Sequence, residues 1–404
     1  MAVGYQGLPT LHPVAGINVA TLSAGIKKPG RRDMVLFSLP QGSSVAAVFT
    51  RNAFCAAPVV VAREHLAQIP PRYLLINTGN ANAGTGETGV RDARESCRYV
   101  AEIMQCNAEE VLPFSTGVIG EPLPMQKLIN AIPGFPSALT HNGWEEAAHG
   151  IMTTDTVAKG VSRQLQIEGK TITITGIAKG SGMIRPDMAT MLAYVATDAK
   201  IAQPMLQQCL NRAVNLSFNR ITVDGDTSTN DACVLIASGQ SGVEISEGSE
   251  SYSPFIAAMT EVCQQLAQLI VRDGEGATKF ISIEVNSGRD EAECEQVAYT
   301  IAHSPLVKTA LFASDPNWGR ILAAVGRAGV DGLDLNSLRI YLGDVCIVRD
   351  GGRASDYTEE RGQTVMARDE ITIHVELARG DASATLWTCD FSYDYVRINA
   401  EYRT

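Results

Sequence analysis

The residues best suited to bond-making chemistry lie in one stretch, Ile177 to Asp198. Its first part contains Lys179-Gly180-Ser181-Gly182, where two glycines free the backbone for positive φ or close approach. Its second part contains the small residue Ala189 followed directly by Thr190. A threonine hydroxyl is a nucleophile once a base takes its proton. Thr190 is therefore a candidate to attack the peptide bond that precedes it.

Local patterns predict what positions this threonine. The alternation of residues 171–177 predicts a strand, and the apolar run from Met191 to Ala196 has the length of a buried strand. Arg185-Pro186 favours an extended connection between them, because proline disfavours a helical residue before it. The alternative interpretation is an ordinary loop before a core strand, with Thr190 a simple β-branched strand residue.

A second stretch, Val111 to Gly120, is predicted to be a loop that carries Thr116-Gly117. Glycine leaves a backbone N–H free to be aimed, and the threonine adds a hydroxyl beside it. Two such donors are suited to hold a developing oxyanion. The alternative is a strand-to-turn transition that needs glycine for its conformation alone.

Two further places hold polar side chains in suggestive settings. Thr154 stands in the run Met152-Thr153-Thr154-Asp155-Thr156, which suits either a turn or a polar pocket. Glu275 stands between two glycines and is suited to pair with an ammonium group. The polar run 221–231 has aspartate spacing that invites a calcium site, but it lacks the closing Glu of an EF-hand loop, so active-site scaffolding is the better interpretation.

Gly84, Gly86 and Gly89 spell the outline of a dinucleotide-binding fingerprint between a predicted strand and a predicted helix. That fingerprint requires its glycines immediately after the strand, whereas a polar segment intervenes after Asn77. A non-enzymatic or dinucleotide-binding protein built on this loop remains an alternative.

Composition excludes several classes of protein. The formal charge of −11 and the absence of a Lys/Arg block argue against nucleic-acid binding. No apolar run is long enough to span a membrane and no secretory signal pattern opens the chain, so a cytoplasmic location is expected. The nine cysteines are scattered without CxxC pairs and the six histidines form no ligand motif, so we expect no disulfide framework and no metal.

The 404 residues exceed what one core normally holds, and the patterns divide them into three segments. Residues 1–198 read as a β-rich domain with the candidate nucleophile, and residues 199–281 as a helix-rich segment that completes the site. Residues 282–404 alternate strands and helices and read as a smaller α+β domain. Within it, Asp315 is expected to cap a helix that starts at Pro316. The last ten residues would ordinarily be a frayed tail.

The quoted stretches resemble those of the ornithine N-acetyltransferases, also called glutamate N-acetyltransferases, of arginine biosynthesis, and the resemblance covers nearly the whole chain. It implies an α/β fold, a layered sandwich of sheets flanked by helices with a smaller C-terminal α+β domain. This is the self-cleaving N-terminal-nucleophile type related to the DmpA-like aminopeptidases. It also implies cleavage between Ala189 and Thr190 into chains 1–189 and 190–404, two copies of each assembling together.

The resemblance further implies the roles of single residues. Thr190 becomes the nucleophile, and Thr116 and Gly117 form the oxyanion hole. The implied substrate contacts are Thr154, Lys179, Thr190, Glu275, Asn399 and Thr404.

The implied reaction moves an acetyl group from N2-acetyl-L-ornithine to L-glutamate through an acetyl-threonine, without a cofactor. Some members also accept acetyl-CoA as the donor, and no residue here decides that second activity. The rival within the same superfamily is an amidase or aminopeptidase, which passes the acyl group to water.

Overall fold

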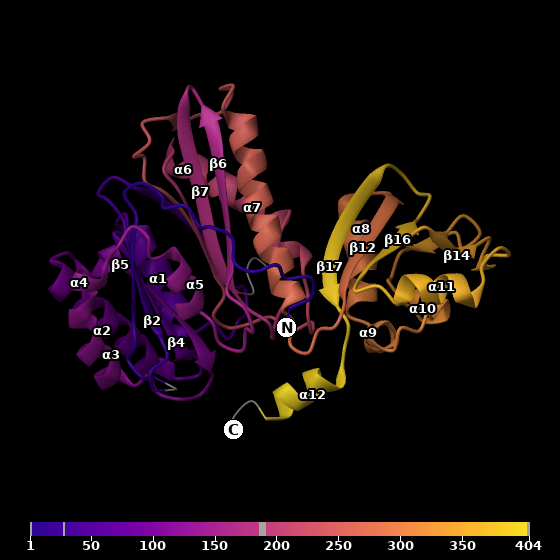
Figure 1. Cartoon of the computed structure of the whole chain (residues 1–404), viewed down its shortest axis with the longest axis horizontal. Helices are drawn as coiled ribbons and strands as arrows, with labels where there is room; N and C mark the ends of the chain where they lie inside the picture. The colour runs from indigo at the N-terminus through magenta and orange to yellow at the C-terminus, as the bar shows by residue number, and fades with distance from the viewer. Residues whose placement is uncertain (1, 27–28, 186–190, 402–404) are drawn as a thin grey trace. The chain divides into compact units, whose positions relative to one another are not determined.

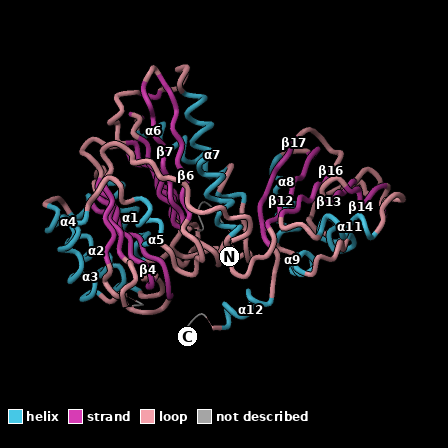
Figure 2. The backbone as a smooth tube through the Cα atoms, in the orientation of Figure 1, coloured by secondary structure: helices cyan, strands magenta, loops and turns pink. Residues whose placement is uncertain are grey.

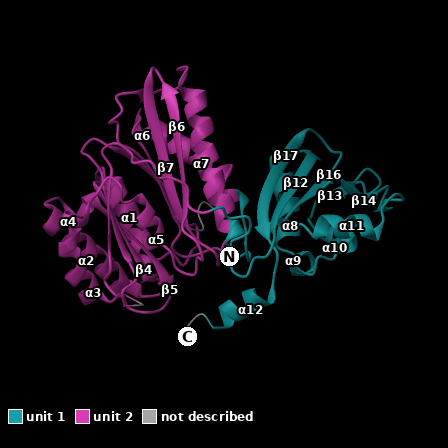
Figure 3. Cartoon of the chain, viewed as in Figure 1, with its two compact units in different colours: residues 1–6, 220–225, 271–404 teal, residues 7–219, 226–270 magenta. Residues whose placement is uncertain are grey.

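The computed structural model describes residues 2–26, 29–185 and 191–401. They form two compact units (Figure 3). The sandwich unit comprises residues 7–219 and 226–270, and the C-terminal unit comprises residues 1–6, 220–225 and 271–404, each within the described ranges.

The described part of the sandwich unit contains two main sheets and one short strand pair. The first sheet has the order β1 (Asn18–Leu22), β2 (Met34–Ser38), β4 (Tyr73–Asn80), β5 (Val111–Val118). The second has the order β3 (Ser44–Phe49), β10 (Ala232–Ala237), β8 (Leu192–Thr197), β7 (Lys170–Lys179), β6 (Lys159–Ile167). The short pair is β9 (Lys200–Ile201) with β11 (Glu244–Ile245).

Alternating side chains explain why these sheets stack. Along β2, Val35 and Phe37 enter the core shared by the two sheets, whereas Leu36 belongs to the core on the opposite face. Phe37 stacks on Tyr194 of β8 with ring centroids 5.3 Å apart. The strands of the first sheet are thus buried on both faces, and the second sheet covers one of them.

Helices cover the outer faces of the sandwich (Figures 1 and 2), except that α5 packs into the core shared by the two sheets. They are α1 (Ala57–Gln68), α2 (Gly86–Met104), α3 (Met125–Ala131), α4 (Phe135–Ala138), α5 (Trp144–Gly150), α6 (Gln203–Asn215) and α7 (Tyr252–Arg272), with 3-10 turns at Ala108–Glu110, Ile132–Gly134 and Phe218–Arg220. Cys97 and Val100 of α2 pack under the first sheet. Leu266 of α7 lies where a Cβ on Gly176 of β7 would meet it, so α7 lies close against the second sheet. The unit is a helix–sheet–sheet–helix sandwich.

The C-terminal unit is built on one mixed sheet. Its order is β15 (Gly352–Arg353), β14 (Val345–Arg349), β13 (Arg339–Leu342), β16 (Glu370–Glu376), β12 (Phe280–Gly288), β17 (Ala382–Cys389). The helices are α8 (Glu291–Ala302), α9 (Pro305–Phe312), α10 (Trp318–Gly326), α11 (Glu359–Met366) and α12 (Tyr393–Ala400). Residues of α8 to α11 and of the sheet share one hydrophobic core. The predicted α/β architecture with a C-terminal α+β part is confirmed.

The two strands predicted around the candidate nucleophile are confirmed as β7 and β8, and all six residues of β8 are buried. The loop predicted over residues 111–120 is wrong, because residues 111–118 form strand β5. Pro113 disfavours a strand interior, but β5 lies at the edge of its sheet, where a missing N–H is tolerated.

The cap predicted at Asp315 is also wrong. Helix α10 starts at Trp318, and the Asn317 side chain accepts from the Arg320 N–H at 3.2 Å. Asp315 instead accepts a hydrogen bond from the Asn317 amide at 3.0 Å, so it orients the residue that caps the helix.

The predicted division at 198/199 and 281/282 is a division along the chain and stays a prediction. The described units instead group residues 226–270 with the sandwich. Within the described ranges, no helix combines the length and apolar character needed to cross a membrane.

Candidate functional site

Thr116 and Gly117 lie on β5, opposite Thr78 and Gly79 of the parallel strand β4. Gly117 has a φ of +137°, and a Cβ there would lie 2.3 Å from the carbonyl carbon of Gly79. Both the conformation and the close backbone approach therefore require glycine at position 117. The predicted oxyanion-hole pair thus lies where two strands approach more closely than a side chain allows.

Buried amide side chains hold the backbone on either side of this pair. The Asn230 amide donates to the carbonyl oxygens of Ser115 at 2.9 Å and Ala81 at 2.6 Å. The Ser115 hydroxyl donates to the Asn77 side chain at 2.6 Å. These bonds connect the end of β5 to the end of β4 and to the polar run 221–231. The sequence predicted a scaffolding role for this run but did not single out Asn230.

Lys179 reaches the same place from the second sheet. Its ammonium donates to the Thr116 hydroxyl oxygen at 3.3 Å, and both side chains are buried. In the second sheet Lys179 pairs with Leu192, which also pairs with Ala232 at the start of β10. The ends of β5 and β7 and the start of β8 therefore meet at one end of the sandwich.

The predicted nucleophile Thr190 and the predicted cleavage partner Ala189 lie outside the described residues. The next residue, Met191, is buried, and its carbonyl accepts from the Ala232 N–H at 2.9 Å. The strand that follows Thr190 is thus anchored beside Lys179.

Thr154 lies close to the glycine run after β7, because its hydroxyl is 2.7 Å from that of Ser181. Asp155 fixes this contact. Its carboxylate accepts from the Gly180 N–H at 2.6 Å and from the Lys159 ammonium at 2.6 Å, and the carboxylate and ammonium are fully buried. Asp155 therefore ties the segment of Thr154 to the segment that starts at Lys179.

The pKa values of two buried carboxyl groups at this site, those of Asp155 and Asp231, are shifted in opposite directions. Burial alone would raise the pKa of Asp155, but the ammonium groups of Lys159 and Lys179 and the Gly180 amide hold that pKa well below its ordinary value. Burial raises the pKa of Asp231 well above its ordinary value, despite the Ser228 hydrogen bond and the charge of Lys179. The Oδ2 atom of Asp231 is buried without a hydrogen-bond partner. The pKa values of these two carboxyl groups are therefore shifted in opposite directions.

The sequence prediction missed four of these residues, namely Asp155, Lys159, Ser181 and Asp231, as members of the site. Asp155, Ser181 and Asp231 stood inside quoted stretches and Lys159 did not, and the importance of all four follows from burial and from contacts that the sequence pattern does not show.

In the C-terminal unit, the predicted contacts Glu275 and Asn399 meet, because the Asn399 amide donates to the Glu275 carboxylate at 2.9 Å. Gly276 permits this approach: its φ is +70°, and a Cβ there would lie 2.4 Å from the Tyr395 nitrogen. The Ser392 hydroxyl also donates to the Gly276 carbonyl at 2.6 Å. The segment at 393–400 is helix α12 rather than a frayed tail. The predicted contact Thr404 lies outside the described residues.

The glycine pattern at residues 84–89 has a structural explanation. A Cβ on Gly89 would overlap the side chains of Thr85 and Asn82, and the Asn82 amide donates to the Gly89 carbonyl at 2.9 Å. Gly89 therefore makes room for a loop closure at the start of α2.

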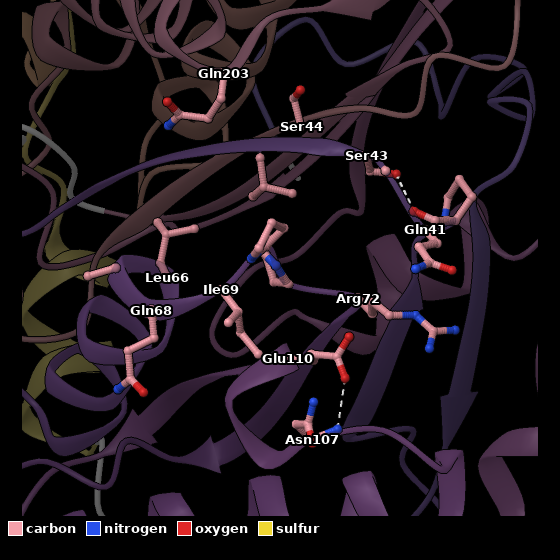
Figure 4. Close-up of a pocket in the computed structure, with 16 residues that line it drawn as sticks. Gln41, Ser43, Ser44, Leu66, Gln68, Ile69, Arg72, Asn107, Glu110 and Gln203 are labelled. Carbon is pink, nitrogen blue, oxygen red and sulfur yellow. Dashed lines mark hydrogen bonds between the residues drawn. The ribbon is translucent and has the colours of Figure 1, made fainter.

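A cavity of about 710 Å³ lies at the opposite end of the two sheets (Figure 4). Its lining includes Ser43 and Ser44 before and at the start of β3 and Arg72 before β4, with Gln203 at the start of α6. Among the predicted site residues that the structure describes, none lines this cavity. The candidate site is therefore defined by its polar contacts and not by this cavity.

Comparison with known proteins gives matches along the full length of the chain. The sequence profile of the ArgJ family matches residues 18–404. An arginine biosynthesis bifunctional protein ArgJ from Pseudomonas fluorescens is 58% identical over 406 residues, covering 100% of both chains. The protein of the same name from Methylococcus capsulatus is 60% identical over 395 residues, covering 98% of this chain and 97% of that protein.

Among solved structures, the arginine biosynthesis bifunctional protein ArgJ of Bacillus halodurans is 40% identical, with a TM-score of 0.49. The match covers 51% of this chain and 97% of that chain. On the profile match and the full-length relatives, this chain belongs to the ArgJ family.

Proposed function

We propose that this chain is a glutamate N-acetyltransferase, which moves acetyl from N2-acetyl-L-ornithine to L-glutamate in arginine biosynthesis. One observation carries the proposal: in an ArgJ family member, the Thr116-Gly117 pair, Lys179 and the strand that follows Thr190 meet at one end of the sandwich. An acyl-transfer site requires this combination of a nucleophile with nearby donors for an oxyanion.

The proposed maturation begins with attack of the Thr190 Oγ on the Ala189 carbonyl carbon. The peptide C–N bond breaks, and the Thr190 nitrogen takes up a proton as it becomes an amine. Water then hydrolyses the ester that joins the two parts, leaving chains 1–189 and 190–404. The new α-amine of Thr190 has an ordinary pKa near ~8, so its neutral form is available as the base for its own hydroxyl.

The proposed catalytic cycle has two half-reactions. Thr190 Oγ attacks the acetyl carbonyl of N2-acetyl-L-ornithine, and ornithine leaves with the proton. The glutamate amine then attacks the acetyl-threonine ester, which yields N-acetyl-L-glutamate and restores the hydroxyl. The hydroxyl of Thr116 and the backbone N–H of Gly117 are the proposed donors to the oxyanion of both tetrahedral intermediates.

The proposed substrate contacts are Thr154, Lys179, Thr190, Glu275, Asn399 and Thr404. The Glu275 carboxylate is buried and bonded to the Asn399 amide. The attraction between opposite charges is stronger in a buried, less polar environment than in water. We propose that it receives the side-chain ammonium of ornithine.

This role predicts the effect of Glu275→Gln. The variant keeps the shape but loses the charge, and a hydrogen bond to a charged group contributes about 1.5–3 kcal/mol. We expect the KM for N2-acetylornithine to rise about 10-fold to 100-fold, with little change in kcat. Steady-state kinetics measure this, with Glu360→Gln on the exposed first turn of α11 as the matched control. An unchanged KM would contradict the assignment.

A second activity is favoured by one observation. The relatives from Pseudomonas fluorescens and Methylococcus capsulatus are both named bifunctional. We propose that acetyl-CoA also acetylates Thr190, which makes the chain an N-acetylglutamate synthase. Formation of N-acetylglutamate from acetyl-CoA and glutamate alone tests this, and its absence leaves only the ornithine-dependent transfer.

The proposal also includes the assembly and location expected from the sequence. Two copies of each cleaved chain associate, and the enzyme acts in the cytoplasm on small amino-acid substrates without a cofactor. Mass photometry of the purified protein tests the assembly.

Mass spectrometry of the protein mixed with N2-acetylornithine alone tests the mechanism. The expected result is one acetyl group on chain 190–404, which glutamate then removes as N-acetylglutamate. Release of acetate at a rate that glutamate does not change would instead support the amidase. A failure to release ornithine would contradict both.

A further inference from the structure

The contact between Lys179 and Thr116 fixes the direction of a hydrogen bond. An ammonium group carries only donors, so the Thr116 oxygen must accept in the 3.3 Å contact. A threonine hydroxyl has one proton, and that proton then cannot point at Lys179. It therefore remains available to an acceptor other than Lys179.

Lys179 is held firmly enough to impose this geometry. It ends β7, in register with Leu192, and it is 9% exposed. The next residue, Gly180, is bonded through its N–H to the buried Asp155 carboxylate at 2.6 Å. The charge of Lys179 favours the ionised forms of both Asp155 and Asp231, so the ammonium lies within the field of two carboxyl groups.

We infer that Lys179 is a positioning residue of the oxyanion hole. By donating to the Thr116 oxygen, it commits the Thr116 proton to the oxyanion and adds a positive charge behind that hydroxyl. This inference rests on the proposed acetyl transfer. It differs from the substrate contact that the family resemblance implies for Lys179.

The two roles predict different kinetic changes. Loss of a ground-state contact to the substrate raises KM and leaves kcat unchanged, whereas loss of an interaction made in the transition state lowers kcat. Removal of one oxyanion donor costs about 10²–10³ in kcat, so loss of its positioning group is expected to cost at least about 10-fold.

The test compares Lys179→Met with Lys170→Met, which makes the same substitution at the exposed start of the same strand. Rates are expressed per cleaved chain, counted by intact mass, so that incomplete maturation does not lower them. We expect kcat to fall at least about 10-fold in Lys179→Met with KM changed less than about 3-fold. Lys170→Met should match the wild type, and Lys179→Arg should recover part of the kcat.

A double-mutant cycle tests whether Lys179 acts on kcat through Thr116, which a purely structural role of Lys179 would not require. If Lys179 acts through Thr116, then Lys179→Met should cost little further kcat once Thr116→Val has removed the hydroxyl. The inference would be overturned if the loss of kcat in the double variant equalled the product of the two single losses, or if Lys179→Met increased KM and left kcat unchanged. Neither result would contradict the proposed acetyl transfer. Absence of acetyl transfer in the wild type would overturn the proposed function and, with it, this inference.

Discussion

Replacing Gly117 with alanine is expected to abolish most acetyl transfer. The added Cβ would lie 2.3 Å and 2.5 Å from backbone atoms of Gly79 and Asn80, and backbone cannot move aside as a flexible side chain does. The substitution also places a side chain at a φ of +137°, which residues other than glycine rarely adopt. The end of β5 must therefore separate from β4 and carry the oxyanion donors with it.

We expect kcat to fall by at least about 10²–10³, the cost of losing one oxyanion donor. Thermal unfolding and steady-state kinetics on the purified variant measure the two consequences. Gly120→Ala is the matched control, because Gly120 also has a positive φ, of +85°, but open space where a Cβ would lie. Equal losses in both variants would show that φ strain, and not the close approach of the strands, explains the result.

Replacing Asp155 with alanine is expected to give the largest loss of stability. The substitution removes the carboxylate 2.6 Å from the Lys159 ammonium, both of which are fully buried. Breaking a buried ion pair by removing one partner typically costs about 3–5 kcal/mol, because the remaining charge is still buried. The Gly180 N–H loses its acceptor at the same time, so the Lys179 segment should loosen and activity should fall too.

The contribution of the Asp155 carboxylate to the free energy of unfolding is expected to depend on pH. The pKa of Asp155 in the folded protein lies below its unfolded value, so the stability that it contributes is present above the unfolded pKa near ~4 and is lost as pH falls through the folded pKa. The difference in free energy of unfolding between wild type and Asp155→Asn should therefore be largest at neutral pH. It should shrink below about pH 4.

Denaturant titrations at several pH values measure this difference, with Asp381→Asn, at an exposed position, as the control. A difference that grows as the solution is acidified would contradict the lowered pKa of Asp155.

The elements around the site differ in how far their sequence predicts them. The alternation of 171–177 and the apolar run 191–196 predicted β7 and β8, because a period of two and a short apolar run are the direct sequence signals of a strand. The alternation did not predict that β7 is buried on both faces over its last eight residues. Strand β5 was predicted as a loop because Pro113 and Gly117 break the pattern. Its place at the sheet edge and the close approach to Gly79 make both residues acceptable, and neither property is visible locally.

The site residues were likewise predictable only where the local sequence marks them. Residue type and setting made Thr116-Gly117 and Glu275 candidates, whereas Asn399 came from the family resemblance alone. The structure places Glu275 and Asn399 in contact. Lys159 looks like an ordinary strand lysine, and its burial follows from a carboxylate on the preceding connection. The importance of Asp231 follows from its burial, which leaves its Oδ2 atom without a hydrogen-bond partner.

The central claim is that Thr190 becomes the N-terminal nucleophile by cutting the chain before itself. The most direct test is the intact mass of the purified wild-type protein beside that of Thr190→Ala. We predict two masses for the wild type, matching residues 1–189 and 190–404, and a single uncut chain without acetyl transfer for the variant. An uncut wild-type protein, or a variant that is still cut and still transfers acetyl, would contradict the account.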